Sequence, residues 1–411
     1  MIPRKHNWTD LALFGGEPAF AQKLHVGRPN IGNRERLLER IASALDRRWL
    51  SNDGVFATEL EQRIRDLLGV KHCTVVCNGT VGLEVGIRAR GLTGEVIVPS
   101  FTFVASAHAL EWLGITPVFC DVQDRTHCID PRKVEELITP GTSAILGVHL
   151  WGQPCAVMEL ADIAERRGLR LLFDAAHAFG CSHQGRMIGN FGSLEVFSFH
   201  ATKFFNTFEG GAIVTNDDAL AERIRAMRNF GYGRHDEIID VGTNGKMNEV
   251  SAAMGLTGLE SLPEFIAVNC ANYQRYKAGL AGRAGVRVLS FDENERCNYQ
   301  YIVLEIDESI TGISRDDLME VLRAENVLAR RYFHPGVHRL EPYRSRCPDA
   351  GSRLPVTERL ANQVLALPTG TAVGVDEVSS ICEIIRMVIA QSGEIRQHLA
   401  AARVPGHVAS R

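Results

Sequence analysis

The feature of this chain that most constrains its fold is a regular alternation of short apolar runs with helical stretches between about residues 30 and 215. The runs, in chain order, are "CTVVCN", "EVIVPS", "TPVFCDV", "SAILGVHL", "LRLLFDAA", "EVFSFH" and "AIVTND". Several are apolar throughout, as expected of strands that are buried on both faces. Three of the intervening stretches have a helical pattern and end at glycine, which is a common helix stop.

This alternation predicts repeated β-α-β units, and hence an α/β fold in which helices cover a mostly parallel sheet. The runs "EVFSFH" and "AIVTND" are joined by too little chain for a crossover helix. At least one of these two strands is therefore expected to run antiparallel to its neighbours.

The second part of the chain predicts a smaller α+β unit. Residues 246–282 have a helical pattern that Pro263 divides or kinks. A strand-like run and two further helical patterns follow. We expect a large domain at residues 1–260, with an N-terminal segment that packs on the small domain, a small domain at 261–395, and a disordered tail at 396–411.

Composition narrows the functional class. The formal net charge is −4 and no block of like charges occurs, which disfavours a nucleic-acid surface. No run is long and apolar enough for a membrane span, and the N-terminus lacks the apolar core of a signal peptide. The ten cysteines are scattered singly and show no metal-site spacing. We expect a cytoplasmic protein that binds no metal, nucleic acid or membrane.

Ligands of open α/β sheets bind beyond the carboxyl ends of the strands, so the residues that follow each run are candidates. "NGT" (78–80) follows the first run and precedes a helix. Gly79 allows close backbone approach there, and a helix N-terminus can hold a phosphate; an ordinary helix-capping turn is the alternative. Phe101 and Phe103 follow the second run, where an aromatic ring either stacks on a planar ligand or packs in the core.

Two later runs are followed by ionisable side chains. Asp174 ends "LRLLFD", where a carboxylate is costly to bury without a cationic or protonated partner, and His177 follows it. Ser198 and Lys203 follow the sixth run. A lysine whose ammonium is partly desolvated has a lowered pKa and forms Schiff bases, whereas a surface charge is the alternative.

Together these elements describe one cofactor. Pyridoxal 5'-phosphate (PLP) needs a phosphate site, an aromatic side chain over its ring, a carboxylate at its pyridinium nitrogen and a lysine for a Schiff base. The chain places a candidate for each at a strand end.

The chain also resembles the DegT/StrS-type sugar aminotransferases, which have the aspartate aminotransferase fold. The similar segments are "WLSNDG", "NGTVGLEVGIRA", "VPSFTFVASAHAL", "VHLWGQP", "DAAHAFG", "SFHATKFFNTFEGGAIVTND" and "GTNGKMNEVSAAMGL". They span roughly residues 10–265, and the C-terminal third is similar more loosely. The resemblance implies PLP fold type I, with a seven-stranded, mostly parallel sheet in the large domain and a smaller α+β C-terminal domain.

The resemblance implies a role for each strand-end residue. Lys203 would form the Schiff base with the cofactor, and Asp174 would pair with its pyridine nitrogen. His177 would lie near the ring, and Phe103 would stack on it. Lys203 and Asp174 are the implied catalytic residues.

The remaining cofactor contacts implied by the resemblance concern the phosphate. Gly79, Thr80 and Ser198 would hold it, and Asn244 would reach the phosphate in the other subunit, which implies a homodimer with shared active sites. One position departs from the family. Phe208 stands where the family usually has the first glycine of Gly-Glu-Gly-Gly, a change that could reshape the sugar pocket.

The activity implied is transfer of an amino group from L-glutamate to a keto carbon of a nucleotide-linked deoxysugar, for deoxyaminosugar biosynthesis. The form "HATKFFNTFEGG" is most similar to members that act on a dTDP-4-keto-6-deoxyhexose and yield dTDP-4-amino-4,6-dideoxy-D-glucose. A 3-keto isomer is the close alternative. A related 3-dehydratase is a more distant enzymatic alternative, but it carries histidine where this chain has Lys203, so the lysine argues against it. A non-catalytic regulator that senses PLP or a sugar nucleotide is an alternative from a different class.

We expect the sugar to lie against "WLSNDG" and the segment "RRYFHPGVHRLEPY", which is rich in groups that could meet a diphosphate. A surface strand-to-loop segment is the alternative for the latter. The candidate substrate residues are Trp151, Tyr332, His334 and His338.

Overall fold

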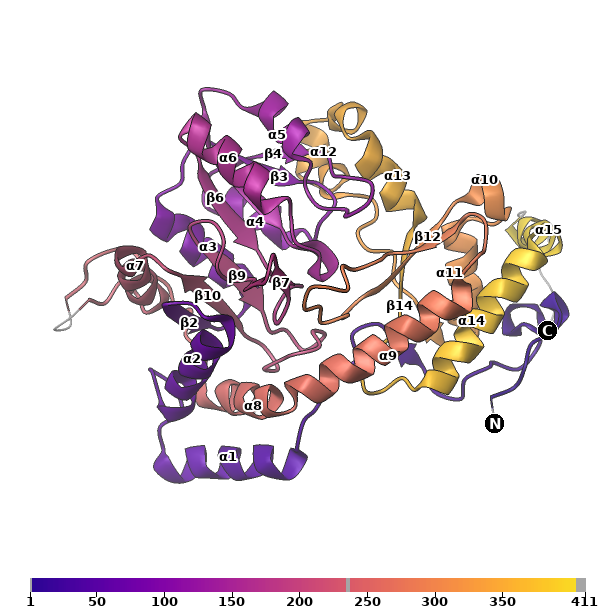
Figure 1. The fold of residues 1–411 in the computed structure, drawn as a ribbon, viewed down its shortest axis with the longest axis horizontal. Coiled ribbons are helices and arrows are strands. Elements are labelled where there is room, and N and C mark those ends of the chain that lie inside the picture. Colours follow the sequence, from indigo (N-terminus) through magenta and orange to yellow (C-terminus); the bar gives the residue numbers. More distant parts are fainter. Residues whose placement is uncertain (1, 234–236, 404–411) are drawn as a thin grey trace.

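A seven-stranded sheet forms the centre of the larger part of the computed structural model, which describes residues 2–233 and 237–403 (Figure 1). All strands that the sequence predicts there are confirmed, and β10 is antiparallel to both of its neighbours while the other pairs are parallel. The order is β2-β10-β9-β6-β5-β3-β4. The strands are β2 (His72–Val76), β3 (Glu95–Pro99), β4 (Thr116–Cys120), β5 (Thr142–Val148), β6 (Arg170–Asp174), β9 (Glu195–Ser198) and β10 (Gly211–Thr215).

Helices cover both faces of this sheet because successive strand residues point to opposite sides. On β6, Leu171 and Phe173 belong to one core, whereas Leu172 belongs to the other. One face packs against α2 (Val55–Leu68), α5 (Pro131–Leu137) and α6 (Val157–Arg167). The other packs against α3 (Gly79–Arg90), α4 (Ala105–Trp112) and α7 (Asp218–Arg228). The result is a three-layer sandwich.

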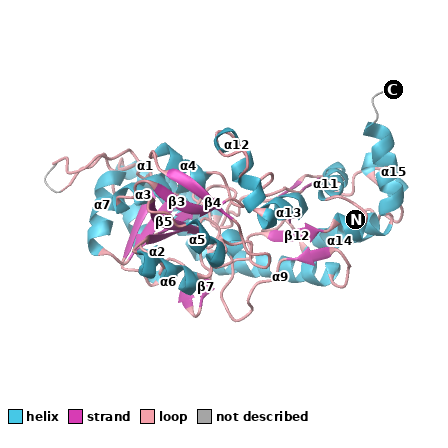
Figure 2. Ribbon diagram, turned by 90° about the horizontal axis from the view of Figure 1, so that it is seen from above, coloured by secondary structure: helices cyan, strands magenta, loops and turns pink. Residues whose placement is uncertain are grey.

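A second unit surrounds a three-stranded antiparallel sheet, and Figure 2 shows it beside the larger sheet. The predicted break at Pro263 is confirmed, since α8 ends at Glu260 and this proline lies in the first turn of α9. The elements are α8 (Glu249–Glu260), α9 (Leu262–Leu280), β11 (Val286–Val288), β12 (Ile302–Ile306), α11 (Arg315–Ala324), α13 (Pro355–Gln363), β14 (Val364–Leu367), α14 (Val375–Ala390) and α15 (Ser392–Arg403).

The N-terminal segment belongs to the core of this second unit. Leu11, Phe20 and Leu24 are buried in the same cluster as residues of α9, β12 and α14. β1 (Leu24–His25) pairs in parallel with β13 (Val327–Leu328). We propose that the boundary between the two domains lies near residue 260, and that the N-terminal segment packs on the small domain.

The remaining elements are short. They are β7 (Ser182–His183), β8 (Arg186–Met187), α10 (Glu308–Thr311), α12 (Tyr343–Arg346) and 3-10 turns at Trp8–Asp10, Ala12–Phe14, Leu150–Gly152, Val337–Arg339 and Ala350–Arg353.

The prediction of a disordered tail from residue 396 is wrong for its first part. α15 continues to Arg403, and its Ile395 and Leu399 are buried in the second core. These residues are one helical turn apart, so they face the same side, and this spacing outweighs the small and polar residues between them. Residues 404–411 lie outside the described residues.

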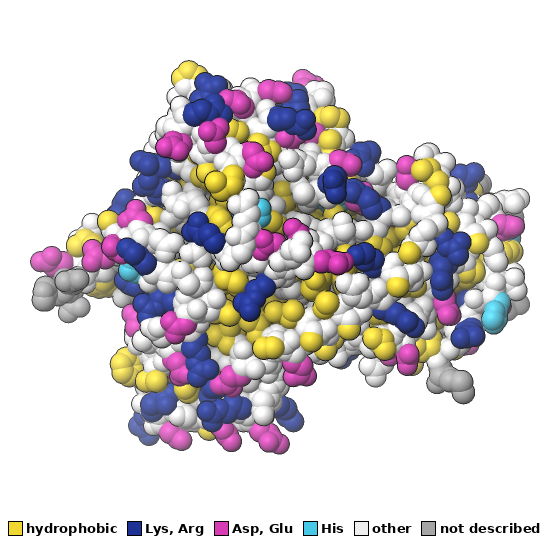
Figure 3. Space-filling view, in the orientation of Figure 1, with side chains coloured by type: hydrophobic (Ala, Val, Ile, Leu, Met, Phe, Trp, Pro, Cys, Tyr) yellow, Lys and Arg dark blue, Asp and Glu magenta, His cyan; other side chains and the backbone are white. Residues whose placement is uncertain are grey.

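Basic and acidic side chains are interspersed over the face drawn in Figure 3, in keeping with the small net charge. Among the described residues, no helix combines the length and apolarity needed to cross a membrane. Within the same residues, no group of three or more histidine, cysteine, aspartate or glutamate side chains is arranged to hold a metal ion.

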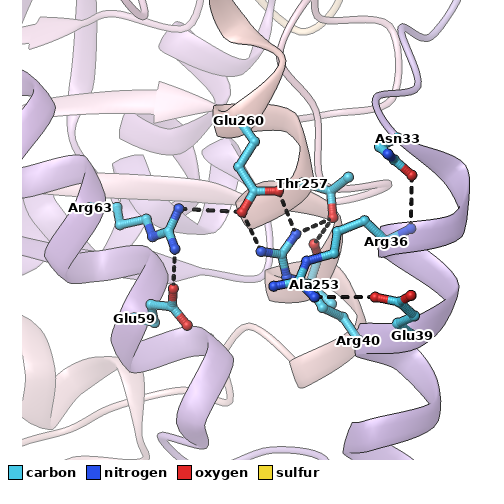
Figure 4. A network of polar contacts seen from close by, with 9 residues as sticks. All are labelled: Asn33, Arg36, Glu39, Arg40, Glu59, Arg63, Ala253, Thr257 and Glu260. Atoms are coloured by element: carbon cyan, nitrogen blue, oxygen red, sulfur yellow. Dashed lines mark hydrogen bonds and ion pairs between the residues drawn. The ribbon is translucent and has the colours of Figure 1, made fainter.

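A buried arginine joins the outlying helix α1 (Arg34–Arg47) to α8 (Figure 4). Arg40 donates hydrogen bonds to Thr257 Oγ1 at 2.8 Å and to Glu260 Oε2 at 3.0 Å, and it also pairs with Glu260 Oε1. Its side chain is 6% exposed, so little water competes for these bonds. The arginine therefore fixes α1 on the body of the protein.

Replacing this arginine tests how much it contributes to stability. Arg40→Met should lower the free energy of unfolding by about 2 kcal/mol, because the loss of charged, buried hydrogen bonds exceeds the gain in apolar contact. Arg36→Ala is the matched control on the same helix, because the exposed Arg36–Glu39 pair is worth less than about 0.5 kcal/mol. Urea unfolding measures both; equal effects of the two substitutions would contradict this account.

Candidate active site

A cavity of about 540 Å³ opens at the carboxyl ends of the central strands, as expected for an open α/β sheet. Loops that follow β2, β3, β6 and β9 line it, and the second unit closes one side. The residues used below are Asn78, Gly79, Thr80, Thr102, Phe103, Asp174, Ala176, His177, Ser198, His200, Lys203, Glu209, Tyr301, Tyr332 and Phe333.

The turn after β2 forms a place for an anion. Asn78 caps α3 by accepting a hydrogen bond from the N–H of Val81 at 2.8 Å, which leaves the N–H groups of Gly79 and Thr80 without intrahelical partners. A Cβ at position 79 would lie 2.9 Å from the Cβ of Ser198, so only glycine lets α3 approach β9 this closely. The helix N-terminus and the Ser198 hydroxyl thus line the same end of the cavity, where the residues fit a phosphate.

The carboxylate of Asp174 is buried at the end of β6. Oδ2 accepts a hydrogen bond from Ser106 Oγ at 2.7 Å, and Oδ1 accepts one from the N–H of Ala176 at 3.0 Å. Burial raises its pKa, while these two hydrogen bonds and the positive charge of Lys203 act in the opposite direction. A buried carboxylate with spare lone pairs is suited to a cationic ring nitrogen.

His177 is buried beside this carboxylate and is held in one tautomer. Its Nδ1 accepts a hydrogen bond from the main-chain N–H of Trp151 at 3.2 Å, so Nε2 carries the proton. Nε2 lies 3.3 Å from the hydroxyl of Tyr301. Burial, and then the positive charge of Lys203, hold the pKa of His177 well below its ordinary value, so the ring is neutral.

Lys203 reaches into the cavity from a turn after β9, in which its N–H donates to the carbonyl of His200 at 2.8 Å. Its Nζ lies 3.3 Å from the hydroxyl of Tyr301. Burial lowers the pKa of Lys203 to about 8, and the negative charge of Asp174 opposes that shift. The position of Lys203 in the cavity wall and its contact with Tyr301 disfavour the surface-charge alternative, and the lowered pKa suits a reactive amine.

The two phenylalanines after β3 have different environments. Phe101 is fully buried and packs edge-on against Trp151 and Phe333, as core packing requires. Phe103 is 57% exposed and lines the cavity, so core packing does not explain it. It is free to contact a planar ligand.

The structure brings only one of the four candidate substrate residues to the cavity wall, Tyr332. Trp151 is fully buried and stacks on Phe333 at 5.2 Å between ring centroids. His338 is buried between Ser100 and Glu358, 2.7 Å from a side-chain oxygen of each.

His334 is half-buried, and its Nδ1 lies 3.1 Å from the carbonyl oxygen of Ala361, so its contact with a sugar stays a prediction. The expected sugar contact of Trp151 and His338 is corrected, because both rings are buried inside the chain. Polar and aromatic rings are common in both settings, so the sequence run does not separate them.

Phe208 and Asn244 also lie outside the cavity lining of this chain. Phe208 is 45% exposed and has a φ of +62°, a left-handed conformation that suits the glycine usual in the family. Asn244 is exposed on a segment that pairs with Asn229. Neither residue lines the cavity itself, although Glu209, which follows Phe208, does.

Sequence reasoning missed two residues of the site. Ser106 lies in the first turn of α4, and its hydroxyl donates a hydrogen bond to the Asp174 carboxylate. Tyr301 comes from the second unit. Its only sequence signal is its place next to β12 in a tyrosine-containing run.

The chain is similar to known proteins over most of its length. The chain matches the model of the DegT/DnrJ/EryC1/StrS aminotransferase family over residues 32–386. It is 36% identical to a dTDP-4-amino-4,6-dideoxy-D-glucose transaminase from Shigella dysenteriae, over 89% of this chain and 99% of that protein. A protein of the same name from Escherichia coli is 34% identical over 88% of this chain and 97% of its own length.

A solved structure, that of DesI in the presence of its TDP-sugar product, is similar with a TM-score of 0.90. The two chains are 50% identical, and the match covers 95% of this chain and 99% of DesI. With the family match over most of its length, this chain belongs to the DegT/DnrJ/EryC1/StrS aminotransferase family.

Proposed function

We propose that this protein is a PLP-dependent transaminase that moves an amino group from L-glutamate to the C4 keto carbon of a dTDP-linked 4-keto-6-deoxyhexose. The observation that carries the proposal is the meeting of an anion-binding turn, a buried carboxylate and a lysine of lowered pKa in one cavity. The relatives indicate the substrate class, because two are named for a 4-amino-4,6-dideoxyglucose and DesI is described with a TDP-sugar product.

The cavity residues fit the parts of the cofactor. Gly79, Thr80 and Ser198 would hold the phosphate, Phe103 would contact the ring, and Asp174 would pair with the ring nitrogen. His177, neutral and buried, would lie beside the ring without adding charge. When bound, PLP supplies an electron sink for the pair left when the Cα–H bond of the amino donor breaks.

Lys203 has two tasks in this proposal. It would bind the cofactor covalently until the amine of the donor displaces it. Its freed ε-amine would then take the Cα proton, and a pKa of about 8 leaves part of the population as neutral amine near pH 7. In the second half of the reaction the same nitrogen would handle the proton at the sugar carbon.

The position of the keto group decides between the main alternatives. A 3-keto sugar aminotransferase of the same family would use the same cofactor residues. A 3-dehydratase is disfavoured by Lys203, and a regulator that binds PLP or a sugar nucleotide without turnover would leave every keto sugar unchanged. The names of the relatives favour C4. The cytoplasmic location stays a prediction from the sequence.

A labelling experiment tests this function. The protein, saturated with PLP, is incubated with ¹⁵N-labelled L-glutamate and with matched dTDP-linked 3-keto and 4-keto 6-deoxyhexoses. We expect ¹⁵N at C4 of the 4-keto sugar in the NMR spectrum, and no label in a reaction that lacks the amino donor. Label at C3 would establish the 3-keto alternative, and no labelled sugar would favour the regulator.

We further propose a homodimer. Two exposed apolar segments lie side by side, because Asp53 pairs with Arg228 at 2.5 Å and the carbonyl of Leu50 accepts a hydrogen bond from the N–H of Glu249 at 3.0 Å. Contiguous exposed apolar surface is typical of an interface. The first segment exposes Trp49, Leu50 and Val55, and the second exposes Phe230, Tyr232, Ile238, Ile239 and Val241.

Asn244 lies on the same face as these segments. Residues 229–233 pair back with 237–244 beside α7, as Figure 1 shows, so Asn244 is carried next to the apolar segment. The carbonyl of the neighbouring Gly245 accepts a hydrogen bond from the N–H of Cys77 at 2.7 Å, which places Asn244 near the turn after β2 that would bind the phosphate. Asn244 is exposed, however, and is not among the residues that line the cavity of its own chain. This placement supports its proposed contact with the phosphate in a partner subunit.

Complementation between two inactive variants tests the shared site. We expect Lys203→Ala and Asn244→Asp each to be inactive alone. A co-expressed mixture should recover about a quarter of the wild-type activity, because half of the dimers are mixed and each has one intact site. If Asn244 acts within its own subunit, every site carries a lesion and no activity returns. Sedimentation analysis supplies the oligomeric state.

A further inference from the structure

The hydroxyl of Tyr301 lies at the junction of two groups of the active site. It is 3.3 Å from Lys203 Nζ and 3.3 Å from His177 Nε2. The tyrosine is nearly buried but lines the cavity. Its hydroxyl is thus the direct neighbour of the nitrogen that acts as base.

The hydrogen bond from His177 fixes one side of this hydroxyl. Because Nδ1 of His177 accepts from the N–H of Trp151, the proton of the neutral ring is on Nε2 and points at the tyrosine oxygen. The indole N–H of Trp151 in turn donates to His127 Nδ1 at 3.1 Å, and His127 Nε2 lies 3.0 Å from Glu305. These contacts hold the Trp151 ring in place, and its main-chain N–H, which can only donate, sets the tautomer of His177.

The hydroxyl therefore has one lone pair and its own proton left for Lys203. It can accept a hydrogen bond from the protonated ε-ammonium, and it can donate one to the neutral ε-amine. Rotation about the C–O bond is the only change needed between these two arrangements. Burial raises the pKa of Tyr301, so the hydroxyl keeps its proton at neutral pH.

The chain also ties the segment of Tyr301 to the loop after β6 that contains His177. The side-chain amide of Asn298 donates hydrogen bonds to the carbonyls of His177 and Phe179 at 2.8 and 3.0 Å, and its oxygen accepts from the N–H of Gln300 at 2.9 Å. The second unit thus holds the tyrosine at a fixed place across from Lys203.

We propose that Tyr301 is a further catalytic residue, whose hydroxyl holds Lys203 Nζ in both its protonated and its neutral form and so aims it during proton transfer. The proposal rests on the proposed function, in which Lys203 is the base. Sequence position alone does not indicate it, because Tyr299, two residues earlier, stacks on Tyr273 in the second core instead.

The test compares Tyr301→Phe with Tyr299→Phe. Tyr299 is the matched control, because it lies two residues earlier in the same run, is not among the residues that line the cavity, and stacks on Tyr273 at 5.0 Å between ring centroids. We expect Tyr301→Phe to slow the half-reaction with L-glutamate about 10- to 100-fold, the effect of losing one hydrogen bond to a charged group. The KM for L-glutamate should stay within about twofold, and deuterium at Cα should slow the variant more than the wild type.

A second readout does not depend on turnover. Cofactor-free protein is mixed with PLP at fixed pH, and the formation of the lysine-bound cofactor is followed by its visible absorbance. We expect about tenfold slower capture in Tyr301→Phe, because Lys203 is no longer aimed, and wild-type capture in Tyr299→Phe. An unchanged half-reaction and unchanged capture in Tyr301→Phe would overturn the proposal, as would equal losses in both variants.

Two controls keep the outcomes separate. If the wild type transfers no amino group from any donor, the proposed function fails; a normal wild type with an unaffected Tyr301→Phe refutes only the role of the tyrosine. Should Tyr301→Phe not fold, 3-fluorotyrosine at position 301 keeps the shape and changes the acidity of the hydroxyl. The half-reaction rate should then change, and an unaltered rate would overturn the proposal.

Discussion

Lys203→Ala is expected to lower kcat by at least about 10²–10⁴-fold, the usual contribution of a positioned general base. The same change should remove the visible absorbance of the lysine-bound cofactor, because no other lysine lines the cavity among the described residues. Burial that lowers the pKa of Lys203 to about 8 is the physical reason for its reactivity. Steady-state kinetics and an absorbance spectrum measure the two effects.

Two control substitutions distinguish this loss from a general effect. Lys277→Ala removes a surface lysine that pairs with Glu293 and should leave kcat and the spectrum unchanged. Lys203→Arg keeps a positive charge but should be as inactive as the alanine variant, because guanidinium is neither a base nor a Schiff-base former at neutral pH. A Lys203→Ala protein with near-normal turnover would refute the role of this lysine.

Asp174→Asn is expected to lower kcat by about 10²–10⁴-fold, because it leaves a buried cationic ring nitrogen without its counter-charge. The same substitution should not lower the free energy of unfolding of the cofactor-free protein. Burial raises the pKa of Asp174, so the ionised carboxylate is disfavoured in the folded, cofactor-free protein. The cofactor-free variant is therefore expected to be as stable as the wild type, or more stable, at pH 7.

The pH dependence of stability checks the direction of the effect that the raised pKa of Asp174 has on folding. A carboxyl group whose folded-state pKa is raised adds stability at low pH, and that contribution is lost as the pH rises and the group ionises. Urea unfolding of the cofactor-free wild type should show this loss relative to Asp174→Asn. Ser106→Ala, which removes only the 2.7 Å hydrogen bond, should reduce kcat less. Activity of Asp174→Asn within about tenfold of wild type would contradict the proposed pairing.

The strands could be predicted from the sequence because a strand that is buried on both faces is apolar along its whole length. In β6 consecutive residues belong to the two different cores, so a strand with helices on both sides has no polar face, and an apolar run identifies it. Gly79, Asp174, Ser198 and Lys203 could be singled out because each ends or follows such a strand. All four line the cavity.

The rest of the site depends on packing between distant parts of the chain. Tyr301 faces Lys203 only because the second unit meets the carboxyl end of the sheet, and Asn298 secures that contact. No local pattern distinguishes it from Tyr299. The reverse error occurs at Trp151 and His338, whose rings suggest ligand contacts but are buried in packing and hydrogen bonds.

The most direct test of the account is to locate the covalent cofactor. Purified protein saturated with PLP is reduced with borohydride, digested and mapped by mass spectrometry. The account predicts the mass of the reduced cofactor on the peptide that contains Lys203, and its loss in Lys203→Ala. Stable modification of a different lysine, or none at all in a protein that transfers amino groups, would contradict it.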